Sequence, residues 1–197
     1  MIDLNMKKFI SQKLKISEDK AFILQKKFYK NYGTTLFGLM KDYKIKPEEF
    51  LDYVHDIDFS RLKKSRLLKQ YLIKLPGEKI LFTNGDEKYA KKVLTSLGIE
   101  KIFQKIFDIK KANYIPKPKK KTYQNLLEKF CLNPKRSVFF EDIEKNLKPA
   151  HDLGIITVHI DIDSEFKKKN QKKHVDFKFK CIKSALRKII QLLGSNK

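Results

Sequence analysis

The chain is poor in cysteine and in arginine, and it has no long apolar run. Among its 197 residues only Cys131 and Cys181 are cysteines, and neither lies in a CxxC pair or in a Cys/His cluster. Isolated thiols of this kind are typical of a protein that is kept reduced in the cytosol. We therefore expect two buried, free thiols.

No apolar run approaches the roughly 20 residues that a membrane-spanning helix needs. The first eight residues also lack the apolar stretch and the small-residue cleavage site of a secretory signal. A composition of 41% hydrophobic and 12% aromatic residues is that of an ordinary folded protein. We expect a soluble, cytoplasmic protein with one sizeable core and no membrane partner.

Acidic residues are also few relative to basic ones. The chain has 45 lysines and arginines but 23 aspartates and glutamates, which gives a formal net charge of +22. Such a field attracts polyanions and phosphorylated ligands. Base-specific readers of nucleic acid usually depend on arginine, and this chain has only Arg61, Arg66, Arg136 and Arg187. The lysines are spread along the whole chain, so we interpret most of them as solvated helix faces, and nucleic-acid binding stays an alternative.

Residues 1–59 show only helical patterns. Ser17 and the sequence Pro47-Glu48-Glu49 are signals of helix starts. The predicted apolar faces are Met6, Phe9 and Ile10; Phe22, Phe28, Tyr29 and Tyr32; Leu36, Leu39, Met40 and Tyr43; and Phe50, Tyr53 and Val54. We predict an all-helical unit over residues 1–59.

From about residue 60 onward, strands alternate with helices. Short apolar runs predict strands at residues 79–83, 106–109, 137–140, 156–160 and 175–179. Helices with one apolar face separate most of these strands, and a last helix follows them. This alternation predicts an α/β core over residues 60–197, with a parallel sheet that helices cover on both faces.

Polar residues follow two of the predicted strands, where ligands of an open α/β sheet gather. The turn Thr83-Asn84-Gly85 can offer a hydroxyl and free amides to phosphate oxygens, with the start of the next helix beside it. Lys117, between two prolines, is a point charge suited to a phosphoryl group. Glu141 and Asp142 offer hard oxygens for Mg²⁺. Each cluster alone also fits an ordinary turn or surface charge.

The order and the spacing of these clusters carry more information than any one of them. Lys117 follows Thr83 by 34 residues, and Asp142 follows Lys117 by another 25. This arrangement resembles the haloacid dehalogenase-like hydrolase superfamily, and in detail its pyrimidine 5′-nucleotidase branch. The resemblance covers nearly the whole chain through eight segments in order, at residues 32–39, 53–58, 75–77, 82–86, 97–99, 106–109, 116–118 and 140–147.

The resemblance implies a Rossmann-like core with a helical cap and a role for each matching residue. Thr83 would bind the phosphate, with Asn84 and Gly85 beside it. Lys117 would neutralise charge between the nucleophile and the phosphate. The cap, residues 1–59, would close over the site and select the leaving group.

The same resemblance implies a magnesium ion and a small phosphorylated substrate. Asp142 would be a direct Mg²⁺ ligand, Glu141 would act through a water, and Asn146 would orient its neighbours. The substrate would be a phosphomonoester, with a nucleoside monophosphate as one candidate. An aspartate would attack the phosphorus, and water would hydrolyse the resulting aspartyl-phosphate.

One part of the family pattern is absent from the sequence. The family begins with a strand that ends in Asp-x-Asp-x-Thr, whose first Asp is the nucleophile, and no Asp-x-Asp-x-Thr occurs in residues 1–197. The similar Asp3-Leu4-Asn5 lacks the apolar run, the second acid and the threonine. We expect a first strand to be missing and the chain as given to be inactive. Two alternatives stay open, a non-catalytic relative that binds phosphate or a partner, and a basic nucleic-acid-associated protein.

Overall fold

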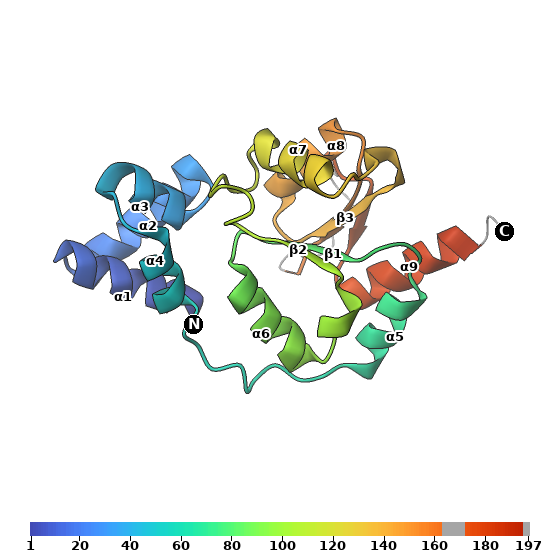
Figure 1. Cartoon of the computed structure of the whole chain (residues 1–197), viewed down its shortest axis with the longest axis horizontal. Helices are drawn as coiled ribbons and strands as arrows, with labels where there is room; N and C mark the ends of the chain where they lie inside the picture. The colour runs from blue at the N-terminus through green and yellow to red at the C-terminus, as the bar shows by residue number, and fades with distance from the viewer. Residues whose placement is uncertain (163–171, 195–197) are drawn as a thin grey trace. The chain divides into compact units, whose positions relative to one another are not determined.

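A computed structural model describes residues 1–162 and 172–194 of the chain (Figure 1). It divides the chain into two compact units, the first of residues 1–63, 81–97 and 106–116, and the second of residues 64–80, 98–105 and 117–197 as far as they are described. The predicted boundary between a cap of residues 1–59 and a core of residues 60–197 stays a prediction. The Lys-rich segment that precedes the last predicted strand lies largely outside the described residues.

The predicted helices of the N-terminal stretch are confirmed. They are α1 (Ile2–Leu14), α2 (Glu18–Tyr32), α3 (Thr35–Tyr43) and α4 (Pro47–Val54), and Figure 1 shows them gathered into one bundle. The hydroxyl of Ser17 caps α2 by accepting from the Lys20 N–H. Their common core is made of residues buried almost completely, namely Phe9, Ile10, Ala21, Phe28, Leu36, Leu39, Ile45, Phe50, Leu51 and Val54.

The predicted apolar face of α2 was too wide. Phe22 is 46% exposed and Tyr29 is 39% exposed, whereas Ala21, Gln25 and Phe28 are the buried residues of this helix. The buried residues form a narrow stripe that meets α1 and α3. Phe22 and Tyr29 each lie one residue, about 100° of rotation, beyond that stripe.

A strand pair and one helix connect the two units along the chain. β1 (Ile80–Phe82) pairs with β2 (Lys105–Phe107), and α6 (Glu87–Leu97) lies between them in sequence. The Thr83 N–H donates to the Phe107 carbonyl at 3.0 Å, and the Gln104 N–H donates to the Lys79 carbonyl at 3.2 Å. Because both pairs advance in the same sense, the two strands run parallel.

The second unit holds a parallel three-stranded sheet, as the alternating pattern predicts. Its order is β3 (Val138–Glu141), β4 (Ile156–Ile160) and β5 (Phe177–Phe179). Val138 is in register with Ile156, and Val158 is in register with Phe177. The α/β class and the parallel sheet are thereby confirmed.

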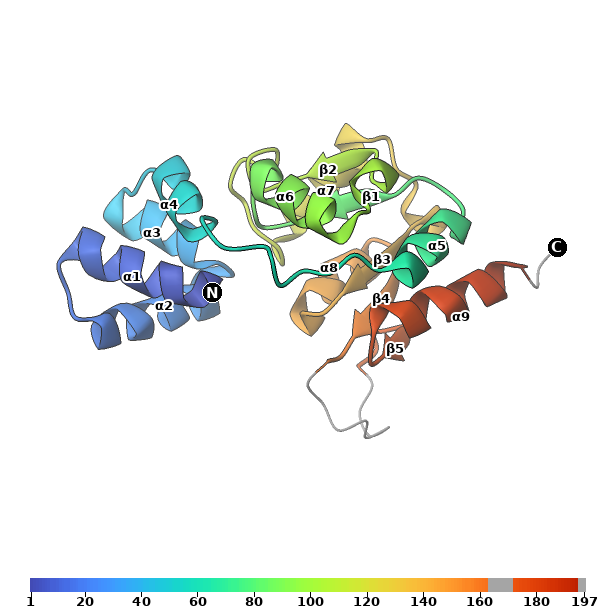
Figure 2. The same cartoon turned by 90° about the horizontal axis from the view of Figure 1, so that it is seen from below.

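Helices cover this sheet. They are α5 (Arg66–Lys74), α7 (Lys120–Lys129), α8 (Leu147–Asp152) and α9 (Ile182–Gly194), with short 3₁₀ turns at Glu100–Ile102, Pro134–Arg136 and Glu144–Asn146. Val158 and Ile160 of β4 pack against Ala185 and Ile189 of α9, and Figure 2 shows α9 beside β4 and β5. Thr157 and His159 point to the other face and are also buried, so both faces of β4 are covered.

The two cysteines are free but not buried. Cys131 follows α7 in a left-handed conformation with φ of 52°, and Cys181 directly precedes α9. Both positions lie at helix ends, where side chains face solvent, and for this reason the predicted burial was wrong. No helix of the described residues has the length and apolarity to cross a membrane.

Candidate functional site

Lys117 and Glu141, two of the predicted site residues, form a buried ion pair in the second unit. Lys117 Nζ lies 2.6 Å from Glu141 Oε2, and the two side chains are 8% and 7% exposed. Glu141 is the last residue of β3, so its side chain is placed where the strand ends. The Lys117 ammonium group also lies 5.3 Å from the centroid of the Phe139 ring.

The surroundings of Glu141 oppose its negative charge. Burial raises the pKa of its carboxyl group and the neighbouring Asp142 raises it further, whereas the Lys117 ammonium group lowers it. Burial is the largest of these effects, so the pKa stays above its ordinary value. An additional cation beside Glu141 would stabilise the charged form.

The loop after β3 is held by two buried side chains. Tyr123 of α7 donates its hydroxyl proton to the Asn146 carbonyl at 2.6 Å, and His159 Nε2 lies 3.1 Å from the Asp142 carbonyl oxygen. Burial, and then the charge of Glu141, raise the pKa of Tyr123, so the phenol keeps its proton as a donor. The Asp142 side chain itself is exposed.

Asn146 carries a buried acceptor without a partner. The residue is 2% exposed, and its Oδ1 accepts no hydrogen bond from any residue that the structure describes. A buried amide oxygen without a donor costs about 1–3 kcal/mol unless a water or a cation meets it. Among the described residues no three His, Cys, Asp or Glu side chains come together as a metal cluster. The side-chain oxygens of this loop that we consider as metal ligands are those of Glu141, Asp142 and Asn146.

The predicted phosphate turn, Thr83-Asn84-Gly85, lies in the first unit directly after β1. The Thr83 hydroxyl accepts a hydrogen bond from the Gly85 N–H at 2.9 Å, and the Ile109 N–H donates to the Gly85 carbonyl at 3.1 Å. The Gly85 amide, which we expected to be free, is thus used inside the turn. The Thr83 hydroxyl keeps its own proton for another acceptor.

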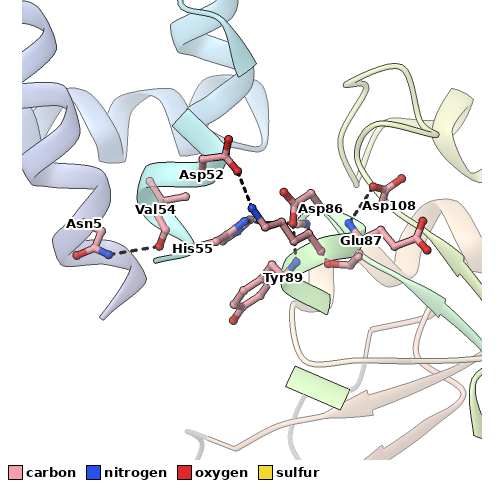
Figure 3. Close-up of polar contacts among 11 residues, drawn as sticks. Asn5, Asp52, Val54, His55, Asp86, Glu87, Tyr89 and Asp108 are labelled. Atoms are coloured by element: carbon pink, nitrogen blue, oxygen red, sulfur yellow. Dashed lines mark hydrogen bonds and ion pairs between the residues drawn. The ribbon is translucent and has the colours of Figure 1, made fainter. Parts of the chain in front are cut away.

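Two aspartates occupy amides at the start of α6. Asp86 Oδ1 accepts from the Tyr89 N–H at 2.7 Å, and Asp108 Oδ2 accepts from the Glu87 N–H at 2.9 Å. These carboxylates cap the helix and offset its positive end. The amides of this helix start that we expected to serve a phosphate are therefore partly taken by Asp86 and Asp108 (Figure 3).

A cavity of about 490 Å³ opens beside this helix start within the first unit. Its lining includes His55, from the residue after α4, and Tyr89, from the first turns of α6. Their rings are stacked, with centroids 4.2 Å apart and planes 13° apart. The remaining lining residues are Asn5, Lys8, Asp52, Tyr53, Asp56, Asp86, Lys88 and Lys92.

The structure thus brings Lys117, Glu141, Asp142 and Asn146 together in one unit and keeps Thr83, Asn84 and Gly85 together in the other. That the two groups build one site stays a prediction. The sequence analysis missed Tyr123 and His159 as supports of the loop after β3. In the sequence Tyr123 is one member of an apolar helix face and His159 one member of a strand, so neither carried a signal of its own.

The sequence does contain one Asp-x-Asp-x-Ser, at residues 56–60, which was not among the predicted site residues. These residues lie in a loop after α4 and follow no strand. Asp58 accepts from the Ser60 N–H at 2.8 Å and from the Ser60 hydroxyl at 2.5 Å. The Asp58 carboxylate is thus engaged in a local turn, and Asp56, the first Asp of this segment, does not end a strand as the nucleophile of the family does.

Among curated proteins, the Phosphate metabolism protein 8 of Saccharomyces cerevisiae is 26% identical to this chain over 189 residues. The similarity covers 86% of this chain and 58% of the yeast protein, so the chain spans little more than half the length of that relative.

Solved structures share the fold at low identity. A haloacid dehalogenase-type phosphatase from Thermococcus onnurineus has a TM-score of 0.61 at 18% identity, over 98% of this chain and 88% of that chain. The hydrolase YfnB of Bacillus subtilis, described as bound to magnesium, has a TM-score of 0.61 at 13% identity, over 96% and 91%. The L-2-haloacid dehalogenase of Xanthobacter autotrophicus has a TM-score of 0.60 at 12% identity, over 96% and 93%. Phosphatases and dehalogenases both have this fold, so the fold alone does not select the reaction.

The sequence matches the family of haloacid dehalogenase-like hydrolases over residues 6–160. That stretch contains most of α1, the other helices of the first unit, the turn at Thr83, the lysine at position 117 and the carboxylates after β3. The chain belongs to the haloacid dehalogenase-like hydrolase family.

Proposed function

We propose that this protein acts as a magnesium-dependent phosphomonoester hydrolase, of the pyrimidine 5′-nucleotidase branch, in the cytoplasm. The observation that carries the proposal is the buried pair of Lys117 and Glu141, with Asp142 next to it at the end of β3. A dehalogenase has no use for a carboxylate pair suited to Mg²⁺, whereas a phosphatase needs one to balance the charge of the phosphoryl group.

The oxygen donors of the loop after β3 fit a magnesium ion that keeps several waters. Asp142 is exposed and able to bind directly, Glu141 is buried with a raised pKa, and the Asn146 Oδ1 has no donor. A divalent cation would favour the charged form of Glu141, and a water bound to it could donate to Asn146. When bound, the ion would polarise the phosphoryl oxygens.

The chain's own residues would bind and neutralise the phosphate. Lys117 is held in place by Glu141 at 2.6 Å, so its charge is preorganised before the substrate arrives. The Thr83 hydroxyl accepts from Gly85 and has its proton left for a phosphate oxygen. By the family resemblance, the attacking aspartate comes from an Asp-x-Asp-x-Thr strand, which residues 1–197 do not contain. The substrate proposed is a small phosphomonoester such as a nucleoside monophosphate.

Binding measured on this chain tests the proposal without the nucleophile. Isothermal titration calorimetry with Mg²⁺, and with orthophosphate in the presence of Mg²⁺, should show one site each. Asp142→Asn should weaken Mg²⁺ binding at least tenfold, a loss of about 1.4 kcal/mol in binding free energy. The matched control is Asp152→Asn, since Asp152 is also partly exposed and pairs with Lys148 at 2.8 Å.

Turnover is tested in a protein in which an apolar strand ending in Asp-x-Asp-x-Thr precedes residue 1. It should hydrolyse p-nitrophenyl phosphate with Mg²⁺, and nucleoside monophosphates would then rank the substrates. Binding without turnover would favour the non-catalytic alternative. A folded protein that binds neither Mg²⁺ nor phosphate would contradict the proposal, and retardation of duplex DNA that fades steeply with salt would favour a nucleic-acid partner.

A further inference from the structure

The imidazole ring of His55 lies against the start of α6 within the first unit, next to the ion pair of Asp52 and Lys88. His55 is the first residue after α4, and its side chain is 12% exposed. Its ring stacks on Tyr89 at 4.2 Å. Asn5 fixes the backbone on either side of His55 by donating to the Val54 and Asp56 carbonyls (Figure 3). His55 is therefore held in one place by both its backbone and its ring.

The polar edge of this ring faces Asp86. His55 Nδ1 lies 3.5 Å from Asp86 Oδ1, and within residues 1–162 and 172–194 this buried nitrogen makes no hydrogen bond of good geometry. A carboxylate at this distance favours the imidazole form that carries a proton on Nδ1. The same Asp86 oxygen accepts from the Tyr89 N–H. His55 thus faces the cap of α6 with its nitrogen and covers the first turns of the helix with its ring.

Gly85 joins this cluster to the phosphate turn. A Cβ atom at Gly85 would lie 3.2 Å from Tyr89 Cδ1, 3.3 Å from Thr83 Oγ1 and 3.7 Å from His55 Cε1. The turn therefore lies close to both rings, and a Cβ atom at this position would require Tyr89 or Thr83 to move by a few tenths of an ångström. A displacement of either ring would therefore be passed on to Thr83 through Gly85.

We propose that His55 is a positioning residue for the phosphate-binding turn, which it holds through the approach of its Nδ1 to the Asp86 cap, while the stacking on Tyr89 places that nitrogen. This inference rests on the proposed function, because it assigns Thr83 the phosphate. It gives a role to His55, which belongs neither to the carboxylates after β3 nor to the Thr83 turn. His55 itself does not contact the substrate.

Charged groups on three sides set how the imidazole titrates. They are Lys8 on α1, Asp52 on α4, Asp56 in the following loop, and Asp86, Lys88 and Lys92 at the start of α6. Burial lowers the pKa of His55 below its ordinary value, and Lys92 adds to this, while Asp86 and Asp52 act in the opposite direction. Removing the Asp86 charge should therefore move the titration of His55 further down.

Three variants separate the ring from the nitrogen. His55→Phe keeps a ring on Tyr89 and removes Nδ1, whereas His55→Asn places an amide nitrogen near the position of Nδ1 and removes the ring. His151→Phe is the matched control, because His151 Nδ1 lies 4.0 Å from Asp152 Oδ1 in the second unit and is 38% exposed. Thermal melts establish that each variant is folded.

The first readout does not involve phosphate. Hydrogen exchange of the Gly85 and Tyr89 amides, which bond to Thr83 and Asp86, should speed up on the order of tenfold in His55→Phe, as loss of an interaction with a charged group predicts. His55→Asn should stay within about threefold of the natural protein, and His151→Phe should not change either amide. A second readout is the NMR titration of His55, whose midpoint should fall in Asp86→Asn.

The third readout is the binding of orthophosphate in the presence of Mg²⁺, whose dissociation constant should rise about tenfold in His55→Phe and recover in His55→Asn. If exchange responds but neither His55→Phe nor Thr83→Ala alters phosphate binding, the positioning of the turn holds and the proposed function fails. Unchanged exchange in His55→Phe, or equal losses in His55→Phe and His55→Asn, would overturn the inference. If His55→Phe does not fold, an unmoved His55 midpoint in Asp86→Asn overturns it instead, and a lowered midpoint supports it.

Discussion

Lys117 Nζ and Glu141 Oε2 lie 2.6 Å apart although 24 residues separate them in the sequence. Both side chains are almost completely buried. The desolvation of two charges is costly, and their close pairing offsets part of that cost. A pair of this kind at a strand end is expected where a third charge, such as a metal or a phosphate, is to be bound.

Lys117→Ala should lower the free energy of unfolding by about 3 kcal/mol, because it leaves the buried Glu141 carboxylate without its partner. Urea denaturation at pH 7 measures the loss. Lys119→Ala is the matched control, since Lys119 is exposed and two residues away. The double variant Lys117→Met, Glu141→Gln should recover most of the stability. Equal stability of Lys117→Ala and Lys119→Ala would show that the pair is not buried in solution.

Gly38→Ala should destabilise the helical bundle by roughly 1–3 kcal/mol, the usual cost of overpacking a core. A Cβ atom at Gly38 would lie 2.3 Å from Phe28 Cγ, and Phe28 is 1% exposed, so the ring has no space into which it can move. Gly194→Ala is the control, because a Cβ atom there meets nothing within 4 Å. A melting temperature of Gly38→Ala equal to that of the natural protein would contradict the packing of α2 against α3.

Tyr123→Phe should cost about 1–2 kcal/mol of stability, because it removes the buried hydrogen bond from Tyr123 to the Asn146 carbonyl. The loop after β3 should loosen as well, so Mg²⁺ binding at Asp142 should weaken although neither side chain of the carboxylate pair has changed. Calorimetry with Mg²⁺ and urea denaturation measure the two effects. Tyr71→Phe in the same unit is the comparison, and a Tyr123→Phe protein with unchanged stability would remove Tyr123 from its supporting role.

Much of the fold could be predicted from the sequence because its signals are local. The runs Ile80-Leu81-Phe82 and Val138-Phe139-Phe140 are apolar on every residue, and the structure places β1 and β3 there, although these six residues are only partly buried. Ser17 and Pro47 mark helix starts through their own backbone chemistry. Such signals need no knowledge of distant residues.

What the sequence did not predict depends on distant partners. Nothing near His55 reveals that its ring lies on Tyr89, 34 positions later, because stacking leaves no periodic pattern. The pairing of Lys117 with Glu141 could be inferred only from the resemblance to a family, since each is one charge among many. The exposure of Cys131 likewise depends on the left-handed backbone conformation that Cys131 itself adopts after α7.

The contact between Tyr114 and Glu48 should make the stability of the protein depend on pH. The Tyr114 hydroxyl donates to Glu48 Oε1 at 2.5 Å and thereby ties the loop after β2 to α4. Burial, and then this carboxylate, raise the pKa of Tyr114 to about 12. The folded protein therefore holds the phenol proton more tightly than the unfolded chain, whose tyrosines titrate near pH ~10.

The sign of the pH dependence follows from this difference. The contribution of Tyr114 to stability should be complete below pH ~10 and should be lost as the pH rises from ~10 to ~12. On the acid side the Tyr114 hydrogen bond lowers the pKa of Glu48, so protonation of Glu48 removes the same contribution as the pH falls through that lowered value.

Tyr114→Phe should be less stable than the natural protein at pH 7, and the two should converge toward pH 12. Tyr53→Phe, whose hydroxyl donates to the neutral Gln12 amide at 3.2 Å, serves as the control and should show no such convergence. Urea denaturation at a series of pH values measures the difference, and a gap between Tyr114→Phe and the natural protein that is constant from pH 7 to 12 would show that the Glu48 contact is absent in solution.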